Sequence, residues 1–365
     1  MKTRERHTTE RFRVVRPRVI GDYEVVAGVG KGSSGEALLA VHRSPDFRKV
    51  AVLKALRSEL EGDPGAIDAF LREARLSANL RHPNIVQTYG ILQADDRYYL
   101  AMEYLEGVPL DRVLRRLDRR SERMPEALAI HIVREALEGL SYAHELIDFN
   151  GRPLRIVHRD VSPANLFVCW DGTVKVLDFG VASTTTTQTD SGLLRGRLAY
   201  MAPEQAMGTV DPRADLFALG VVLYELLTGS RLRPAGNDIK TLETMQPTKD
   251  ALETALEGQS RAARAAVLGA LAPIDARFSN AAKMAAALDQ VEEAHQRETL
   301  ATFIAERFIG ERQAQEARLA DALKTNEPSS SFPPEEDVAP PETPRLFLGL
   351  VLVAALVLAW ILLQG

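Results

Sequence analysis

Two polar clusters in the middle of the chain carry the residues best suited to chemistry. In the first, Asp160 precedes Asn165 by five positions, and in the second, Asp178 is followed by Phe179 and Gly180. Apolar runs bracket both clusters, as expected for buried strands that deliver polar residues into a loop. Two acids and an amide at one place could position a hydroxyl group. They could also hold a hard divalent cation such as Mg²⁺, which prefers oxygen ligands that it shares with phosphates.

The composition allows a two-lobed globular body with appendages. A chain of 365 residues exceeds one average domain, and 45% apolar with 26% charged residues is an ordinary globular mixture. The net charge of −5 gives no general case for nucleic-acid binding, so no nucleic-acid partner is expected. The single cysteine, Cys169, excludes an internal disulfide or a cysteine-based metal cluster and fits a reducing compartment. Its apolar neighbours indicate a small buried residue rather than a reactive thiol.

A glycine-rich turn lies near the beginning of the chain. Gly30, Gly32 and Gly35 would let a strand–turn–strand press its backbone amides against phosphates, because no Cβ blocks the approach. The same spacing also marks dinucleotide sites, but these require a helix directly after the glycines. Here residues 37–41 have the pattern of a strand, and a second strand follows at 49–54. The pattern therefore favours a phosphate-binding hairpin.

The motifs, taken in order, resemble those of the serine/threonine protein kinases, particularly the eukaryotic-type kinases of bacteria. The resemblance covers about residues 21–290 and rests on the glycine turn, Lys54 at the end of an apolar strand, His158-Arg-Asp160 with Asn165, and Asp178-Phe-Gly. It implies an α+β, two-lobed protein kinase fold. The N-lobe, about 21–104, would hold an antiparallel sheet plus one main helix, and the C-lobe, about 105–290, would be mostly helical.

The resemblance also implies roles for individual residues, with ATP and Mg²⁺ (or Mn²⁺) as cofactors and proteins as substrates. Asp160 would accept or orient the proton of the attacking hydroxyl, and Asn165 and Asp178 would hold the metal ion. Lys54 would hold the α- and β-phosphates, with Glu73 as its partner from a helix with an inward apolar stripe. The other predicted nucleotide contacts are Val29, Gly30, Gly32, Gly35, Ala37, Val52, Met102, Glu103 and Leu105.

Within this set, Met102 would lie at the back of the adenine pocket, and the backbone of Glu103 to Leu105 would meet the purine edge. Two residues above the purine depart from the family pattern, because the family usually has valine where Ala37 stands and alanine where Val52 stands. We hypothesise that the two changes compensate in volume, since packed sites tolerate swaps that keep the total volume.

Several polar residues, and one long helix over residues 125–145, are expected to support the C-lobe. The expected structural residues are His131, His144 and His158, with Asp215 bracing the catalytic-loop backbone and Arg277 pairing with Glu204.

Two further departures concern charge near the transferred phosphate. Ser162 stands where serine/threonine kinases usually place a lysine, and Arg197 stands where a threonine is common. One interpretation is that Arg197 supplies part of the missing positive charge, because an always-charged planar guanidinium suits phosphate contact. The other is that Arg197 is exposed and tunes substrate choice. The sequence leaves both open.

Residues 183–191 are rich in hydroxyl groups and resemble an activation loop. Thr187, Thr189 and Ser191 are the candidate phosphorylation sites, and Arg159 would receive the phosphate, because phosphorylation adds negative charge that arginine can pair. The alternative is a polar loop that is never modified.

The flanking segments differ in composition. Residues 1–20 carry seven Lys/Arg and two Glu, which predicts a basic, solvated tail, with a membrane-surface or regulatory contact as the alternative. Residues 291–324 have helical composition and can pack on the lobe, extend as a stalk or mediate pairing. Residues 325–345, with six prolines and five acids, predict an extended linker.

Residues 346–363 form an uncharged apolar run of 18, about the shortest length that spans a bilayer as a helix. Arg345 on its N-terminal side favours a cytoplasmic kinase domain. We therefore expect a single-pass C-terminal transmembrane helix in the cytoplasmic membrane, with the lipid bilayer as a partner.

Together these features predict a membrane-tethered serine/threonine protein kinase that transfers the γ-phosphoryl group of ATP to proteins. Activation-loop autophosphorylation between two copies, and hence a homodimer, is expected. A nucleotide-binding pseudokinase or scaffold is the main alternative, and its grounds are Ser162 and Arg197. A small-molecule phosphotransferase is disfavoured by the Ala202-Pro203-Glu204 segment.

Overall fold

The computed structural model describes residues 18–32, 35–44, 47–56, 62–179, 198–208, 210–233, 248–289 and 296–324. All of them belong to one compact unit, residues 1–324, and none to the second unit, 325–365. The predicted linker 325–345 and the apolar run 346–363 lie outside the described residues, as do Thr187, Thr189, Ser191 and Arg197. Across the described ranges, no helix is both long and apolar enough to cross a membrane.

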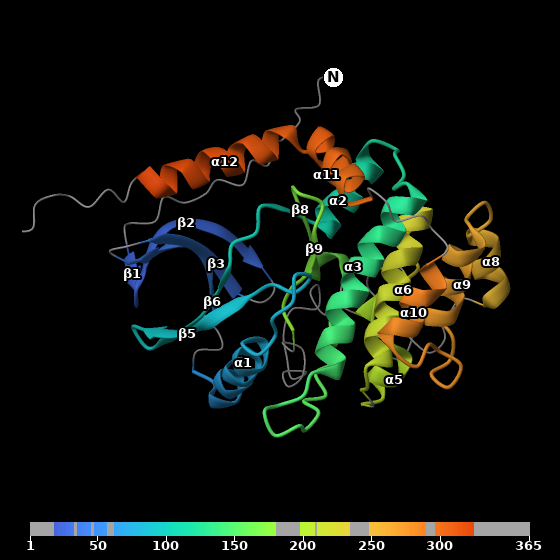
Figure 1. Cartoon of the computed structure of the whole chain (residues 1–365), viewed down its shortest axis with the longest axis horizontal. Coiled ribbons are helices and arrows are strands. Elements are labelled where there is room, and N and C mark those ends of the chain that lie inside the picture. Colours follow the sequence, from blue (N-terminus) through green and yellow to red (C-terminus); the bar gives the residue numbers. More distant parts are fainter. Residues whose placement is uncertain are drawn as a thin grey trace, which may run out of the picture. The chain divides into compact units, whose positions relative to one another are not determined.

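A six-stranded antiparallel sheet forms the N-lobe, with strand order β1-β2-β3-β4-β6-β5 (Figure 1). Side chains alternate across it, and one face buries an apolar cluster that includes Leu38, Leu53 and Tyr99. The strands are β1 (Arg18–Ile20), β2 (Tyr23–Gly32), β3 (Gly35–Arg43), β4 (Arg48–Ala55), β5 (Thr88–Ala94) and β6 (Arg97–Glu103).

Residues 18–20, which were predicted to belong to a solvated basic tail, instead form the first strand, β1. Arg18–Ile20 pairs with β2, and the Ile20 side chain is fully buried in the N-lobe cluster. The turn between the two strands passes through Gly21, whose φ of 55° is a left-handed conformation that favours glycine. Three residues are too few to display an alternating pattern, so their place in the sheet was not predicted.

The main N-lobe helix, α1 (Pro64–Ser77), begins at a cap that the sequence encodes. The Asp63 side chain accepts a hydrogen bond from the backbone N–H of Gly65 at 2.8 Å, and Pro64 occupies the first helical turn. The buried residues Ala66, Phe70, Glu73, Ala74 and Ser77 recur at helical spacing and form one inward stripe. This stripe places the Glu73 carboxylate inside the N-lobe.

The C-lobe is mostly helical, as predicted. Helix α3 (Glu126–Glu145), which matches the predicted helix, packs on the almost wholly buried α6 (Arg213–Thr228) at its centre (Figure 1). The other helices are α2 (Leu110–Arg119), α5 (Pro203–Ala206), α8 (Lys249–Ala255), α9 (Arg261–Ala270) and α10 (Ala281–Leu288). A small antiparallel sheet joins β7 (Gly107–Pro109), β8 (Leu166–Cys169) and β9 (Val174–Val176).

Residues 296–324 of the predicted helical segment pack on the body, which is one of the three arrangements that the sequence left open. They contain α11 (Gln296–Arg307) and α12 (Ile309–Lys324). Leu300, Ile304 and Phe308 are fully buried in the C-lobe core, and Ala322 joins an apolar cluster on the N-lobe sheet. These two helices therefore belong to the folded unit and do not extend from it as a stalk.

Candidate active site

The glycine turn closes a hairpin and does not begin a helix. Gly32 and Gly35 are opposed at the end of β2 and β3, and Gly30 is opposite Ala37. A strand, β3, follows the glycines directly, so the dinucleotide-binding arrangement, which needs a helix there, is excluded.

The strand register gathers four of the predicted nucleotide-site residues on one face of the sheet. Ala37 is opposite Lys54, Val52 is opposite Met102, and residues two apart on β4 share a face. Val52, Met102 and Leu105 also meet in one apolar cluster. Ala37, Val52, Lys54 and Met102 therefore line the same surface, as the proposed volume compensation requires.

Exchanging the side chains of Ala37 and Val52 tests the proposed volume compensation. The double variant Ala37→Val with Val52→Ala restores the family's usual pair, and we expect its MgATP dissociation constant to stay close to that of the wild type. Each single change alters the total volume, and we expect each to weaken binding by roughly 1 kcal/mol, measured by calorimetric titration. Strictly additive effects of the two single changes would contradict the hypothesis.

The centre of the site is an ion pair between the two lobes. Lys54 Nζ on β4 lies 2.8 Å from Asp178 Oδ1, although 124 positions separate the residues. The Lys54 side chain is 9% exposed and that of Asp178 is 21% exposed. Asp178 has a φ of 55°, a left-handed conformation that a short polar side chain tolerates better than most. Glu73, Asp178 and Phe179 line one cavity of about 10 Å³, with room for about one water molecule.

Asn165 is oriented by Asp160, five residues before it. The Asn165 Nδ2 group donates to the Asp160 carbonyl oxygen at 2.8 Å and to Asp160 Oδ2 at 3.1 Å. Because both bonds use the amide nitrogen, Asn165 Oδ1 is turned away from Asp160. The Asn165 carbonyl in turn accepts from the backbone N–H of Leu177, next to Asp178. The two polar clusters of the sequence are thus joined.

Asp215 braces the catalytic loop, as predicted. Its side chain is buried, and its two oxygens accept hydrogen bonds from the backbone N–H groups of His158 and Arg159, both at 2.8 Å. His144 Nε2 lies 2.8 Å from the same carboxylate, which confirms a structural role for this histidine. Arg159 has a φ of 69°, so the brace holds the loop in a conformation that is uncommon for its residue type.

The His158 ring connects the catalytic loop to the segment that carries Asp178. The ring is fully buried, its Nε2 lies 2.6 Å from the Leu177 carbonyl oxygen, and its Nδ1 accepts from the Asp160 N–H at 3.2 Å. Its edge contacts the Phe179 ring, with centroids 4.7 Å apart. With both nitrogens in use, His158 packs and positions its neighbours, as predicted, and does not face a substrate.

The predicted pair of Arg277 and Glu204 is also confirmed. Arg277 donates to both oxygens of the Glu204 carboxylate, at 2.5 and 3.2 Å, and its side chain is 1% exposed. This bidentate, buried geometry fixes the segment after residue 198 to the helical body.

Cys169, predicted to be buried, is only partly buried, and its surroundings disfavour a reactive thiol. Burial raises the pKa of its thiol to about 12, so the thiolate needed for nucleophilic chemistry is scarce at neutral pH.

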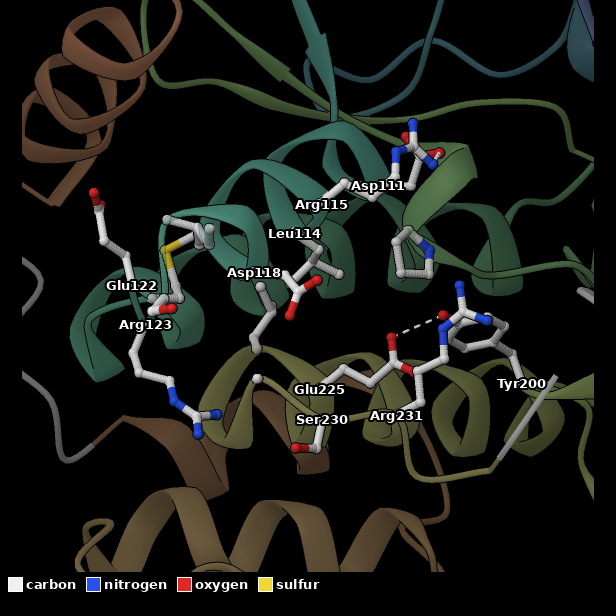
Figure 2. Close-up of a pocket in the computed structure, with 16 residues that line it drawn as sticks. Asp111, Leu114, Arg115, Asp118, Glu122, Arg123, Tyr200, Glu225, Ser230 and Arg231 are labelled. Atoms are coloured by element: carbon white, nitrogen blue, oxygen red, sulfur yellow. Dashed lines mark hydrogen bonds and ion pairs between the residues drawn. The ribbon is translucent and has the colours of Figure 1, made fainter. Parts of the chain in front are cut away.

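A cavity of about 590 Å³ next to the catalytic loop was not predicted from the sequence (Figure 2). Its lining includes Pro163, three residues beyond Asp160, together with Tyr200 and Glu225. The Tyr200 hydroxyl donates to Glu225 Oε2 at 2.8 Å (Figure 2). The buried Glu225 Oε1 has no hydrogen-bond partner among the residues that the structure describes. The sequence signal for this site is a single acid within the apolar run 221–227.

The buried Glu225 carboxyl makes stability depend on pH. Burial raises its pKa above the ordinary value of 4.5. A group with a raised folded-state pKa contributes stability that is complete below the unfolded value and is lost as pH rises through the folded-state pKa. We therefore expect Glu225→Gln, which can still accept from Tyr200, to raise the free energy of unfolding at pH 7 by about 1 kcal/mol. Denaturant titrations from pH 4.5 to 7.5 measure this effect.

The exposed Glu257→Gln is the matched control for that experiment, since its side chain lies on the surface. Two results would contradict the expectation: a pH dependence of stability in Glu225→Gln equal to that of the wild type, or a lower free energy of unfolding at pH 7. Either would show that the ionised Glu225 carboxylate does not destabilise the fold.

The geometry described so far agrees with a comparison to known protein families. The sequence of residues 23–305 matches the family described as the protein kinase domain. The chain belongs to the protein kinase family. The match includes most of α11 and passes the predicted boundary at residue 290, whereas α12 lies beyond it.

Individual relatives cover parts of the chain. It is 41% identical over 229 residues to Tyrosine-protein kinase MasK of Myxococcus xanthus (62% of this chain, 35% of that protein). It is 37% identical over 217 residues to Serine/threonine-protein kinase PrkC of Bacillus subtilis (58% and 31%). The PknI kinase domain of Mycobacterium tuberculosis superposes with a TM-score of 0.58 at 25% identity, covering 76% of this chain and 99% of that one. The chain spans about a third of the length of the two curated relatives.

Proposed function

We propose that this protein is an ATP-dependent serine/threonine kinase that phosphorylates other proteins. The observation that carries the proposal is the contact between Lys54 Nζ and Asp178 Oδ1, 2.8 Å apart, beside the Asp160–Asn165 pair. One cation, two acids and one amide oxygen suffice for phosphoryl transfer, which needs mainly positioning and charge neutralisation.

The donor set fits a magnesium-bound nucleotide. The Asp178 carboxylate and Asn165 Oδ1 are hard oxygen ligands of the kind that Mg²⁺ or Mn²⁺ prefers, and Lys54 would hold phosphate oxygens. When bound, the metal ion neutralises charge on the phosphates. Asp160 would orient the acceptor hydroxyl and take its proton, and Asn165 holds the Asp160 carboxylate in place at 3.1 Å. His158 and Asp215 keep this loop in register.

Two features support a polypeptide acceptor. The cavity of about 590 Å³ borders the catalytic loop at Pro163 and is lined by both acidic and basic side chains, including Asp111, Asp118, Arg115 and Arg231. Such a mixed polar hollow suits an extended peptide better than a small apolar metabolite. The relatives named serine/threonine kinases support a serine or threonine acceptor.

Tyrosine is a second candidate acceptor, for two reasons. The relative with 41% identity is named a tyrosine-protein kinase. In addition, Ser162 occupies the position where serine/threonine kinases usually carry a lysine.

We further propose that residues 346–363 anchor the protein in the cytoplasmic membrane, with the kinase domain in the cytoplasm. The support is the length of this uncharged run and the Arg345 flank. Trans-autophosphorylation within a homodimer, at Thr187, Thr189 or Ser191, would then be favoured by tethering. Arg159 would receive the phosphate, and Arg197 remains either a relocated cation or a determinant of substrate choice.

A labelling experiment tests the proposed activity. The full chain in detergent is incubated with γ-labelled ATP, Mg²⁺ and a mixed protein acceptor, and the labelled amino acids are separated after acid hydrolysis. We expect phosphoserine and phosphothreonine. Phosphotyrosine alone would favour the second acceptor, and nucleotide binding without label in any protein would favour the pseudokinase or scaffold.

A further inference from the structure

Helix α12 bridges the two lobes, and it lies outside the region that matches the protein kinase family. Near its beginning, Arg116 on α2 of the C-lobe pairs with Glu311 and donates to the Arg307 carbonyl at 2.5 Å. At its end, Arg48 on β4 of the N-lobe donates to the Leu323 carbonyl at 2.7 Å. A helix of 16 residues is about 24 Å long, enough to reach from one lobe to the other (Figure 1).

The end of α12 also packs on β3, on the face of the N-lobe sheet that carries the proposed nucleotide site. Ala322 is 5% exposed and contacts the buried Leu39 and Val41 of β3, with Val50 and Tyr104 at the edge of the same cluster. Leu39 lies two residues from Ala37 on the same face of β3. Docking of α12 therefore buries apolar surface directly beside the nucleotide-binding face of the sheet.

At the middle of α12, the Gln315 side chain bonds the connector between the lobes, which runs from Glu103 at the end of β6 to Gly107 at the beginning of β7. Gln315 Oε1 accepts from the Gly107 N–H at 3.1 Å and from Trp170 Nε1 at 2.7 Å, and Gln315 Nε2 donates to the Leu105 carbonyl at 3.1 Å. One side-chain amide therefore provides hydrogen-bond partners for the Gly107 N–H, the Trp170 indole N–H and the Leu105 carbonyl.

The connector is confined on its other side as well. A Cβ on Gly107 would overlap the carbonyl oxygen of Val168 on β8, so the backbone of residue 107 lies directly against the small sheet. The Glu103 side chain is occupied by Lys175 Nζ, 3.0 Å away, and by the Gln87 N–H. The Glu103 N–H is likewise bonded to the Gln87 carbonyl at 2.8 Å, and Gln315 fixes the Leu105 carbonyl, so the remaining backbone groups of residues 103–105 are held in place to meet a purine.

We propose that Gln315 is a positioning residue for the nucleotide-binding connector, and that α12 acts as a brace that holds it there. The inference rests on the proposed function, because it assigns the connector to purine binding. It goes beyond that function by making ATP affinity depend on a helix outside the family's common domain.

Replacing Gln315 by leucine, which keeps most of its size and removes the hydrogen bonds of its amide, tests the proposal in the full chain. We expect the KM for ATP and the dissociation constant of MgATP to rise roughly three- to thirtyfold, with kcat at saturating ATP nearly unchanged. Gln313→Leu is the matched control, since Gln313 is exposed on the same helix, and it should behave as the wild type. Gln315→Glu, which retains the two acceptor bonds, should give an intermediate KM.

Tryptophan fluorescence gives a second readout that needs no activity. The chain has two tryptophans, Trp170 and Trp360, so Trp360→Phe leaves Trp170 as the only emitter. In that background, Gln315→Leu should change the wavelength of Trp170 emission, because the indole N–H loses its hydrogen-bond partner, and Gln313→Leu should not.

Two results would overturn the proposal. One is an equal KM for ATP in Gln315→Leu and Gln313→Leu, and the other is a fall in kcat with an unchanged KM. Failure of the wild-type chain to bind MgATP would instead refute the proposed function itself, so the two failures are distinguishable.

Discussion

Asp160→Asn is expected to lower kcat for phosphoryl transfer by about 10²- to 10⁴-fold while MgATP still binds with close to wild-type affinity. The asparagine keeps the shape of the side chain and can still accept from Asn165 Nδ2, which bonds Asp160 Oδ2 at 3.1 Å. It cannot take the proton of an acceptor hydroxyl. Lys54 and Asp178, which would hold the phosphates and the metal ion, are untouched. Steady-state rates with labelled ATP, together with calorimetric titration of MgATP, measure the two effects separately.

Asp250→Asn is the matched control, because Asp250 is an exposed acid at the beginning of α8, remote in sequence from both clusters. Equal losses of kcat and of nucleotide affinity in Asp160→Asn would show that the residue supports the loop rather than the reaction. A kcat within threefold of wild type would exclude it as the acceptor base.

Asp215→Ala is expected to reduce the free energy of unfolding by about 3–5 kcal/mol. The change removes the carboxylate that accepts from the backbone N–H groups of His158 and Arg159 and contacts His144, and it leaves these groups buried without a partner. Asp215→Asn retains one acceptor oxygen, so its loss should be smaller, about 1–3 kcal/mol. Urea denaturation followed by circular dichroism gives both values.

The same variants should also lose activity per folded molecule, because the brace holds Arg159 at a φ of 69° directly before Asp160. Asp250→Ala provides the baseline for removing an aspartate from the surface. If the free energy of unfolding of Asp215→Ala lies within 1 kcal/mol of the wild-type value, the three hydrogen bonds of Asp215 do not stabilise the fold as proposed.

Much of the site could be predicted because its residues are tied to short, ordered motifs. The apolar runs around Asp160 and Asp178 predicted strands that end in polar loops, and β8 and β9 lie next to these clusters. The roles of Asp215 and of the Arg277–Glu204 pair followed from the family resemblance, and each appears as a set of hydrogen bonds in the structure. Local pattern and tertiary contact agree at these positions.

Other contacts leave no local signal. Gln315 is one of two glutamines on α12, and nothing in its neighbourhood distinguishes it from the exposed Gln313. Its function depends on where α12 docks, and that is decided by small contacts such as Ala322 on β3. The direct bond from Lys54 to Asp178 joins residues of different lobes, so it too depends on how the lobes close together.

Burial of charge within a helix is the third kind of contact that was not predicted. Glu225 lies in an apolar run of α6. A single acid in such a run is usually exposed to solvent, so the sequence did not indicate that it lines a cavity. Its partner, Tyr200, comes from a separate segment of the chain, so the hydrogen bond between them leaves no local pattern in the sequence.

The most direct test of the account is a crystal structure of the full chain with Mg²⁺ and an ATP analogue whose β–γ bridge cannot be hydrolysed. We expect Lys54 Nζ on the phosphate oxygens, Asp178 and Asn165 Oδ1 on the metal ion, and the purine edge against the backbone of residues 103–105. A nucleotide bound elsewhere, or one in the cleft that neither Lys54 nor Asp178 contacts, would contradict the proposed active site.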